Sequence, residues 1–493
     1  MIFLICHKCS LETLLLSEKN GKNHELRIPH NSVREKGPFS GIAKGGAMTK
    51  DIYRQLGNRR EIMKRGHDIR HAAFLCILMV LFAAVYVAGF PAIALTQEVA
   101  EEPKSGDWIS VLKFEEPRFA YSTLGMLGGD TAEVLETMHR IKEGDMESWY
   151  EEWNRTAERV FKVAEEAEKK GHDVSAGEAY MRASHYYMAS EFYTHDDLTK
   201  PRAVEQARKS VACFKKAIKL LRVPVEIVSI PYEGTTLPGY LYSSPYAGES
   251  APLLICHTGF DGNVEGMYGT AMAAIERGYH CLAFEGPGQG GMLRDRGMKF
   301  RPDWENVMTP IVDYAVTIPG IDPEKIAVLG WSFGGYLAPR AACYEHRPKV
   351  YIANGGIYSF YESCMNHIPP ELQYLYKTDP KTYNAEVAKA MKHSIMLKWG
   401  MQDSLWKIGG DSIAEVMTKL EKFTLEGHVD KIKSHIVVVD SETDVLIQQA
   451  HPKTWMLFTV EEAANAHCQS GAKSVSFQRM FDWLDEFFDH SRK

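Results

Sequence analysis

The sequence has little that would indicate a metal, a nucleic acid or a disulfide framework. Its nine cysteines are scattered, and Cys6 and Cys9 form the only C-x-x-C pair, without a second pair or matching histidines to complete a zinc site. The formal net charge of -7 gives no reason to expect a nucleic-acid partner. We therefore expect no metal or other cofactor, and a small neutral or organic substrate.

The composition is that of a globular protein, with 45% hydrophobic and 25% charged residues. A chain of 493 residues is too long for one ordinary domain, so one large domain with accessory segments is expected. Composition does not determine the oligomeric state, and a homodimer is left open.

One long apolar run without formal charges covers residues 72–97. Lys and Arg outnumber Asp and Glu in residues 48–71, and an A-x-A sequence stands at residues 92–94. This layout predicts an export signal, and thus a periplasmic or secreted protein. The alternative is an uncleaved anchor, which would give membrane association through residues 72–97.

Residues 1–71 are interpreted as an N-terminal extension, because export signals normally stand at the start of a chain. Met48 and Met63 are alternative starts. If the N-terminal segment is an artefact of gene calling, the protein is expected to be cytoplasmic.

Residues 105–222 lack strand signals and are expected to form a helical lid or platform domain. Trp149, Tyr150 and Trp153 are interpreted as core packing rather than as a ligand site. The aromatic side chains of this segment need a partner surface, and we expect them to close a pocket in the rest of the chain. Apolar residues recur at helical spacing between Gly and Asp breaks in residues 131–143, 148–170, 175–193 and 200–221.

From residue 223 to residue 493, short β-rich runs alternate with helices. This alternation is typical of a mostly parallel sheet with helices on both faces. Residues 357–430 interrupt it with helical character and are interpreted as an insertion near the functional site. Strands are expected at 225–231, 239–243, 253–257, 280–284, 326–330, 350–353, 435–440 and 455–459.

The strand at 326–330 runs into the motif G-W-S-F-G at residues 330–334, and a helix is expected from about Tyr336. A strand, a sharp turn and a helix around G-x-S-x-G make the nucleophile elbow of α/β-hydrolases, in which a strained serine exposes its hydroxyl. A surface serine in a Gly-rich turn is the alternative, but it does not account for the flanking strand and helix. The motif therefore predicts an α/β-hydrolase fold with Ser332 as the nucleophile.

A serine hydroxyl needs a histidine to take its proton, and that histidine needs an acid to fix its tautomer. The order along the chain in this fold is Ser, acid, His. Asp444 follows the seventh predicted strand and is the expected acid, with Asp440 and Glu442 as competitors. His467 stands between the last strand and the final helix and is the expected base, whereas His451 comes earlier.

An oxyanion hole requires two backbone N–H groups, one from the residue after the nucleophile and one from the loop after the third strand. Phe333 is expected to supply the first and Phe260 the second. Glu285 ends the fourth predicted strand and is open to two interpretations. It is either an acid–base or substrate contact, or a structural carboxylate bound to loop N–H groups.

The chain resembles one known group of hydrolases, which contains 2,6-dihydroxypseudooxynicotine hydrolase and the fungal polyketide-shortening hydrolases of pigment synthesis. The resemblance spans residues 115–490. The segments that carry it are DMESWYEEW (145–153), HTGFDG (257–262), FEGPGQG (284–290), GWSFGGYLAPRAA (330–342), SETD (441–444) and EEAANAHCQ (461–469).

The resemblance implies a helical N-terminal domain against an α/β-hydrolase core, with a triad of Ser332, His467 and Asp444. In that family the triad hydrolyses a carbon–carbon bond beside a ketone, and similar esterases share the architecture. The resemblance also implies Glu362 as an extra acidic side chain near the site. The familiar members are intracellular, so the predicted export signal is a departure from them.

The sequence therefore predicts an enzyme that forms an acyl-enzyme on Ser332 and cleaves a small acyl or ketone substrate. The bond is expected to be a carbon–carbon bond next to a ketone, or an ester. A carboxylesterase or a peptidase of the same fold is the enzymatic alternative. A catalytically dead binding protein is the alternative from another class, and it would be expected to lack a triad member, of which none is missing.

Overall fold

The computed structural model describes residues 129–142, 144–196, 201–366, 368–442 and 454–491, all of which belong to one compact unit of the chain. The predicted N-terminal extension and export segment (1–71 and 72–97) lie outside these residues. Among the helices of the described part, none combines the length and the apolar character that are needed to cross a bilayer.

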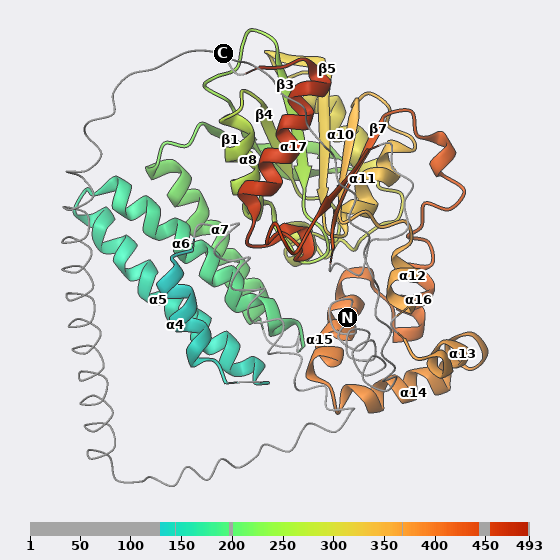
Figure 1. Cartoon of the computed structure of the whole chain (residues 1–493). Coiled ribbons are helices and arrows are strands. Elements are labelled where there is room, and N and C mark those ends of the chain that lie inside the picture. The colour runs from blue at the N-terminus through green and yellow to red at the C-terminus, as the bar shows by residue number, and fades with distance from the viewer. Residues whose placement is uncertain (1–128, 143, 197–200, 367, 443–453, 492–493) are drawn as a thin grey trace, which may run out of the picture. The chain divides into compact units, whose positions relative to one another are not determined.

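An eight-stranded sheet forms the centre of the described part, with the strand order β1-β2-β4-β3-β5-β6-β7-β8 (Figure 1). The pairs β1–β2 and β2–β4 are antiparallel, and all other neighbours are parallel. This topology confirms the expected α/β-hydrolase fold. The strands are β1 (Val225–Tyr232), β2 (Thr235–Tyr242), β3 (Ala251–His257), β4 (His280–Phe284), β5 (Ile321–Trp331), β6 (Val350–Asn354), β7 (His435–Ser441) and β8 (Thr454–Phe458).

The hairpin of β1 and β2 closes sooner than the sequence predicts. Glu233 and Gly234 both have positive φ and join the strands in a two-residue turn. Pro238 lies inside β2, one residue before the start that the sequence predicts for this strand. Because β2 pairs with β4 from Gly239 onward, Pro238 falls outside that ladder, and a proline is tolerated there.

Alternate residues of the central strands enter two separate hydrophobic cores, one on each face of the sheet. Leu254 and Cys256 of β3 belong to the first core, and Leu253 and Ile255 belong to the second. Helices on both faces bury these strands, as expected for a mostly parallel sheet. The first core contains α8 (Tyr268–Ile275) and α17 (Lys473–Phe488), and the second contains α10 (Glu305–Ala315) and α11 (Gly334–Ala342).

The N-terminal part of the described chain is helical, as predicted, and will be called the helical segment (129–222). Helix α5 packs against α6, and α6 packs against α7 (Figure 1). The Asp145 carboxylate caps the start of α5 by accepting a hydrogen bond from the Ser148 N–H. The helices are α4 (Thr131–Arg140), α5 (Met146–Lys169), α6 (Asp173–Glu191), the short 3₁₀ helix η2 (Phe192–Asp196) and α7 (Arg202–Leu220).

The aromatic side chains of the helical segment pack mainly on one another. The Trp153 ring is fully buried and lies 6.0 Å from the Trp149 ring and 5.7 Å from the Tyr186 ring, measured between centroids. The Trp149 indole N–H donates to the carbonyl oxygen of Ala189. Core packing therefore accounts for both tryptophans, whereas Tyr150 is half-buried under the Arg202 guanidinium.

Aromatic contacts join the helical segment to two other parts of the described chain, the sheet and the insertion. Phe214 of α7 packs against Tyr240 of β2, with ring centroids 5.2 Å apart. Phe192 and Tyr193 of η2 both pack against Trp399, at 5.2 Å. Trp399 belongs to the insertion, so the helical segment meets the insertion as well as the sheet.

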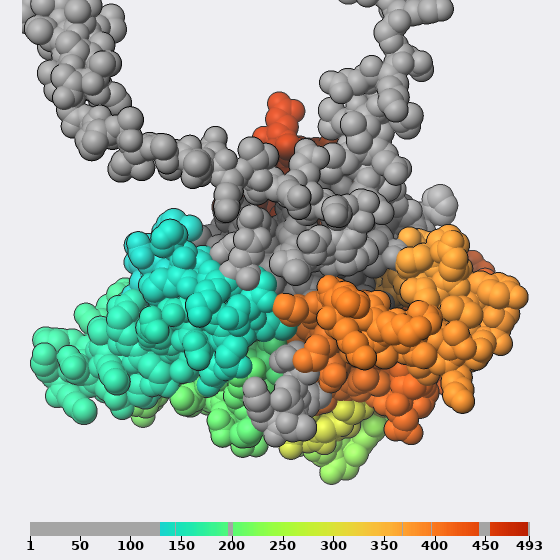
Figure 2. Space-filling model, turned by 90° about the horizontal axis from the view of Figure 1, so that it is seen from below, coloured from blue at the N-terminus to red at the C-terminus, as the bar shows by residue number. Residues whose placement is uncertain are grey.

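The insertion predicted at 357–430 is helical. Figure 2 shows its helices (orange) beside the helical segment (teal) on one face of the molecule, consistent with the packing of α15 on η2. Its helices are α12 (Phe360–Met365), α13 (Pro370–Thr378), α14 (Pro380–Met391), α15 (Ile395–Ile408) and α16 (Ile413–Leu420).

The first prediction concerns the core of the helical segment. Trp153→Ala should lower the free energy of unfolding by about 3–5 kcal/mol, because it leaves a cavity where a fully buried ring was. Leu135→Ala is the control, since the Leu135 side chain is 55% exposed. Chemical unfolding followed by tryptophan fluorescence and circular dichroism measures both. Equal, small effects of the two changes would contradict the packing.

Candidate active site

Ser332 lies at a sharp turn between β5 and α11 and has a φ of +60°, which is rare for a residue with a side chain. Its N–H donates to the carbonyl oxygen of Asn354 (2.7 Å), and its own carbonyl accepts from the Gly335 N–H (2.7 Å). A Cβ at Gly335 would collide with the carbonyl oxygen of Gly355. The glycines of the motif thus allow a close approach of helix and strand that holds the serine in its strained conformation.

His467 approaches this serine from the loop before α17. Its Nε2 atom is 2.8 Å from the Ser332 Oγ atom, within hydrogen-bond distance. The Cys468 sulfur is 3.5 Å from the same nitrogen. The two residues that the sequence indicated as nucleophile and base are therefore in direct contact, 135 residues apart in the chain. A hydroxyl hydrogen-bonded to an imidazole is what activation by a general base requires.

Gln469 ties the histidine loop to the ends of two strands. Its side-chain carbonyl accepts from the Asn354 amide of β6 (2.8 Å), and its amide donates to the Ser441 hydroxyl of β7 (3.0 Å). Cys468 and Gln469 both have positive φ, so the backbone around the histidine is tightly turned. Sequence reasoning did not identify Gln469, although it lies in the same EEAANAHCQ segment as His467.

Lys473 is a buried cation close to this loop. Its ammonium donates to the carbonyl oxygen of Cys468 and lies 3.5 Å from the centroid of the Trp331 ring. Burial lowers the pKa of Lys473 to about 7. No pattern in the sequence indicated Lys473.

The expected acid, Asp444, and the rival base, His451, lie outside the described residues. Both competitors for the acid are described and make other contacts. The Asp440 carboxylate accepts from the Trp455 indole N–H at 2.7 Å, and the Glu442 carboxylate accepts from the Val460 N–H at 2.7 Å.

The loop of residues 258–262, called here the oxyanion loop, lies directly against the nucleophile. A Cβ at Gly259 would come within 2.5 Å of the Phe333 nitrogen and 2.8 Å of the Ser332 Cβ. The Gln289 side-chain amide holds this loop by donating to the carbonyl oxygen of Thr258 (2.6 Å). Within the described part of the chain, the N–H groups of Phe333 and Phe260 donate no hydrogen bond.

The structure does not bring Glu285 or Glu362 to Ser332. The two Glu285 carboxylate oxygens accept from the N–H groups of Val264 (2.9 Å) and Gly291 (2.8 Å), which matches the structural interpretation of this residue. Burial raises its pKa. Glu362 is exposed in the first turn of α12, where its N–H is capped by the Ser359 hydroxyl. The helix turns it outward, because the face of α12 with Phe360 and Cys364 is the buried one.

A pocket opens at Ser332, and the core and the insertion line it. Its wall is mostly apolar, and Asp261, Asp403 and Ser404 form its polar part. No residue from the described part of the helical segment lines it. Trp399 of α15 lines the pocket and packs on Phe192 and Tyr193, so the described part of the segment contacts the pocket wall through α15. The apolar lining residues include Phe260, Phe333, Ile357, Phe360, Cys364, Trp399, Met401, Val416, Met417 and Leu420.

The fold and the serine–histidine pair define the class of α/β-hydrolases, and comparisons with known proteins agree. The profile of the Alpha/beta hydrolase family matches residues 253–465. Hydrolase LUC6 of Fusarium sp is 33% identical over 395 residues, which cover 74% of this chain and 94% of that protein. The 20-hydroxy-prefusarin hydrolase FUS2 of Gibberella moniliformis is 30% identical over 394 residues, with coverage of 74% and 94%.

Among solved structures, the 2,6-dihydroxy-pseudo-oxynicotine hydrolase matches with a TM-score of 0.58 at 20% identity, covering 76% of this chain and 97% of that one. At this identity the likeness shows a shared fold. The chain belongs to the alpha/beta hydrolase family, and it is a hydrolase. The resemblance inferred from the sequence motifs is confirmed.

The second prediction concerns the oxyanion loop. Gly259→Ala should lower kcat about tenfold to a hundredfold, because the added methyl group must push the loop away from Phe333. Gly171→Ala is the control. Its φ of +77° strains an alanine without any atom in contact, so it costs stability far from the pocket. Steady-state kinetics and thermal unfolding of both variants test this, and an unimpaired Gly259→Ala enzyme would contradict the close contact.

Proposed function

We propose that the protein is a serine hydrolase in which Ser332 attacks a carbonyl carbon of a small organic substrate. The observation that carries this proposal is the 2.8 Å contact between the Ser332 hydroxyl and His467 at the strained end of β5. His467 accepts the hydroxyl proton, and Asp444 fixes the histidine tautomer. The position of Asp444 in the chain supports this role, as do the other contacts made by Asp440 and Glu442.

The reaction follows from this arrangement in two halves. Attack by Ser332 Oγ forms a tetrahedral intermediate, whose negative oxygen accepts hydrogen bonds from the N–H groups of Phe333 and Phe260. The intermediate collapses to an ester of Ser332 as the leaving group departs and takes the proton held by His467. Water then attacks this ester with His467 as base, which releases a carboxylic acid and restores the serine.

The bond that breaks is either a carbon–carbon bond next to a ketone or an ester. A carbon leaving group requires a neighbouring carbonyl, which stabilises it as an enolate until it is protonated, whereas an ester releases an alcohol. The apolar pocket favours an organic acyl substrate in both cases. Parallel assays with β-diketones, acylphenols and aryl esters distinguish the two reactions, since product analysis identifies the bond that was broken.

The third prediction tests the nucleophile. Ser332→Ala should lower kcat by about 10⁴-fold or more while the protein stays folded, because the change removes one hydroxyl and no packing. Ser404→Ala is the matched control, because Ser404 lines the same pocket but its hydroxyl donates to the carbonyl oxygen of Gly400. Turnover of an aryl ester and labelling by a fluorophosphonate probe measure the effect. Activity close to wild type in Ser332→Ala would refute the mechanism.

The fourth prediction tests the acid. Asp444→Asn should lower kcat by about 10³- to 10⁴-fold, because an amide at this position would select the wrong tautomer of the histidine. Asp440→Asn and Glu442→Gln should lower kcat far less, since these carboxylates contact Trp455 and Val460. The three variants are compared by kcat on one substrate, and the reverse order would assign the acid to another residue.

A further inference from the structure

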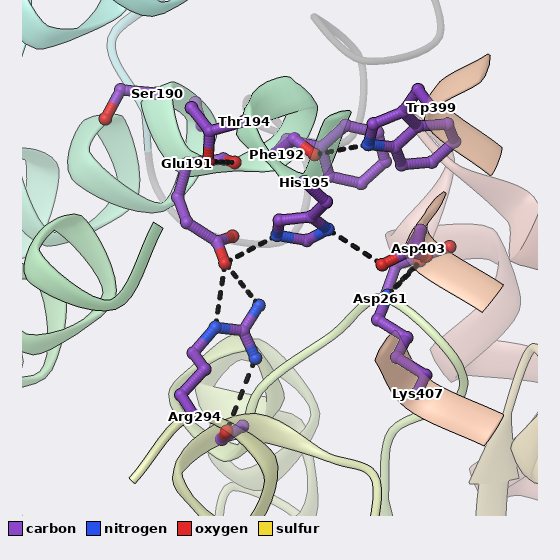
Figure 3. Close-up of polar contacts among 12 residues, drawn as sticks. Ser190, Glu191, Phe192, Thr194, His195, Asp261, Arg294, Trp399, Asp403 and Lys407 are labelled. Atoms are coloured by element: carbon purple, nitrogen blue, oxygen red, sulfur yellow. Dashed lines mark hydrogen bonds and ion pairs between the residues drawn. The ribbon is translucent and has the colours of Figure 1, made fainter. Parts of the chain in front are cut away.

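Six charged side chains form one continuous network between the helical segment, α9 (Gly290–Arg294), the insertion and the oxyanion loop (Figure 3). Opposite charges meet at every contact. Arg294 binds Glu191 (2.7 Å), Glu191 binds His195 (2.7 Å), His195 binds Asp403 (2.8 Å), Asp403 binds Lys407 (2.8 Å), and Lys407 binds Asp261 (2.7 Å).

The network is almost completely shielded from water. The side chains of Glu191, His195, Asp403 and Lys407 are at most 2% exposed, whereas that of Asp261 is 24% exposed and faces the pocket. Burial by itself would lower the pKa of His195, but the carboxylates on both sides outweigh it and raise the pKa. Burial would likewise raise the pKa of Glu191, yet its cationic partners lower it to about 2.

A buried set of this kind gains little stability over apolar side chains of similar size, because each charge loses its hydration. The network instead determines where its charged side chains lie relative to one another. Each charge is compensated only where its partners lie, so a shift of one group leaves another charge buried and unpaired. The position of Asp261, at one end of the network, is therefore coupled to the position of Arg294 and Glu191 at the other end.

Lys407 connects this network to the oxyanion loop at two points. Its ammonium binds the Asp261 carboxylate and lies 4.7 Å from the centroid of the Phe260 ring. The Phe260 ring also stacks on the Phe300 ring, with centroids 5.3 Å apart. The backbone N–H of Phe300 donates a hydrogen bond to the Lys407 carbonyl oxygen. Lys407 itself does not line the pocket at Ser332, so it can influence a substrate there only through its partners, which are Asp403 of α15 and the loop residues Asp261 and Phe260.

We infer that Lys407 is a positioning residue for the oxyanion hole, and that the helical segment sets the place of the oxyanion loop through His195, Asp403 and Lys407. The inference rests on the proposed serine hydrolase function, in which Phe260 donates to the oxyanion. Helices that line no part of the pocket would thereby act on the transition state. The segment would affect kcat rather than substrate binding.

Lys407→Met and Asp261→Asn test this positioning role. In both variants kcat for a small aryl acetate should fall about tenfold to a hundredfold, with KM changed less than about threefold, because the misplaced N–H acts mainly in the transition state. The inhibition constant of an aryl trifluoromethyl ketone, which forms a tetrahedral adduct on the serine, should rise by the same factor. Asp261→Glu, which keeps the charge, should recover part of the loss.

His195→Gln tests the part played by the helical segment. His195→Gln should also lower kcat. In the double variant with Lys407→Met, the fold loss in kcat should be smaller than the product of the two single fold losses, because both changes interrupt one network. Independent, multiplicative effects would show that the helical segment does not act through Lys407.

Arg340→Gln is the control for a general loss of stability. Arg340 makes a two-point ion pair with Glu305, whose side chains are 9% and 15% exposed, and this pair has no contact with the loop. This variant should lose thermal stability and keep both kcat and ketone affinity. If all variants lose activity only in proportion to their stability, the network is merely structural and the inference fails.

The remaining outcomes are decisive as well. A higher KM with unchanged kcat in Asp261→Asn would make Asp261 a substrate contact and overturn the inference. If Lys407→Met does not fold, the Asp261→Asn and Asp261→Glu variants of the partly exposed Asp261 decide the question alone.

An inactive Ser332→Ala beside fully active Lys407→Met and Asp261→Asn would refute this inference and leave the proposed function intact. An active Ser332→Ala would refute the proposed function itself.

Discussion

The strained backbone of Ser332 is the constraint on which the rest of the site depends. A residue with a side chain stays at a φ of +60° only where its surroundings hold it there. Two backbone hydrogen bonds stabilise this conformation, one from the Ser332 N–H to Asn354 at the end of β6 and one from the Gly335 N–H of α11 to the Ser332 carbonyl oxygen. Glycines let these chain segments approach closely. The hydroxyl is therefore presented at the carboxyl edge of the sheet, where the histidine loop and the oxyanion loop also arrive.

Each of those loops has its own support. The histidine loop is fixed by the Gln469 side chain, which spans the ends of β6 and β7, and by the buried ammonium of Lys473. The oxyanion loop is held by Gln289 on one side and by Lys407 on the other. Amide and ammonium donors thus hold both loops in place beside the serine.

The described part of the helical segment uses its aromatic side chains mainly for packing among its own helices. These rings pack on one another within the bundle. Among the described residues, rings of η2 and α7 contact aromatic side chains in other parts of the chain. The pocket wall nearest to it belongs to α15, whose Trp399 separates the segment from the substrate space. Within the described residues, packing and charged contacts on α15 join these helices to the wall of the pocket.

The sequence by itself determined the fold class, most strand positions, the helices of the N-terminal segment and the pair Ser332 and His467. These features follow from local patterns, namely apolar periodicity, glycines around a serine, and the order of residues after the last strands. The positions of Glu285 and Glu362 did not follow, because a carboxylate after a strand looks alike whether it binds loop N–H groups, faces water or faces a substrate.

Only the tertiary structure revealed the network through His195, Asp403 and Lys407. His195 and Asp403 are 208 residues apart in the chain, and no spacing rule relates them. Their meeting results from the packing of η2 on α15, which buries the charged groups and so forces them to find partners of opposite sign. Burial is a property of the assembled fold, and for this reason the charges that support the oxyanion loop could not be distinguished in the sequence from ordinary surface charges.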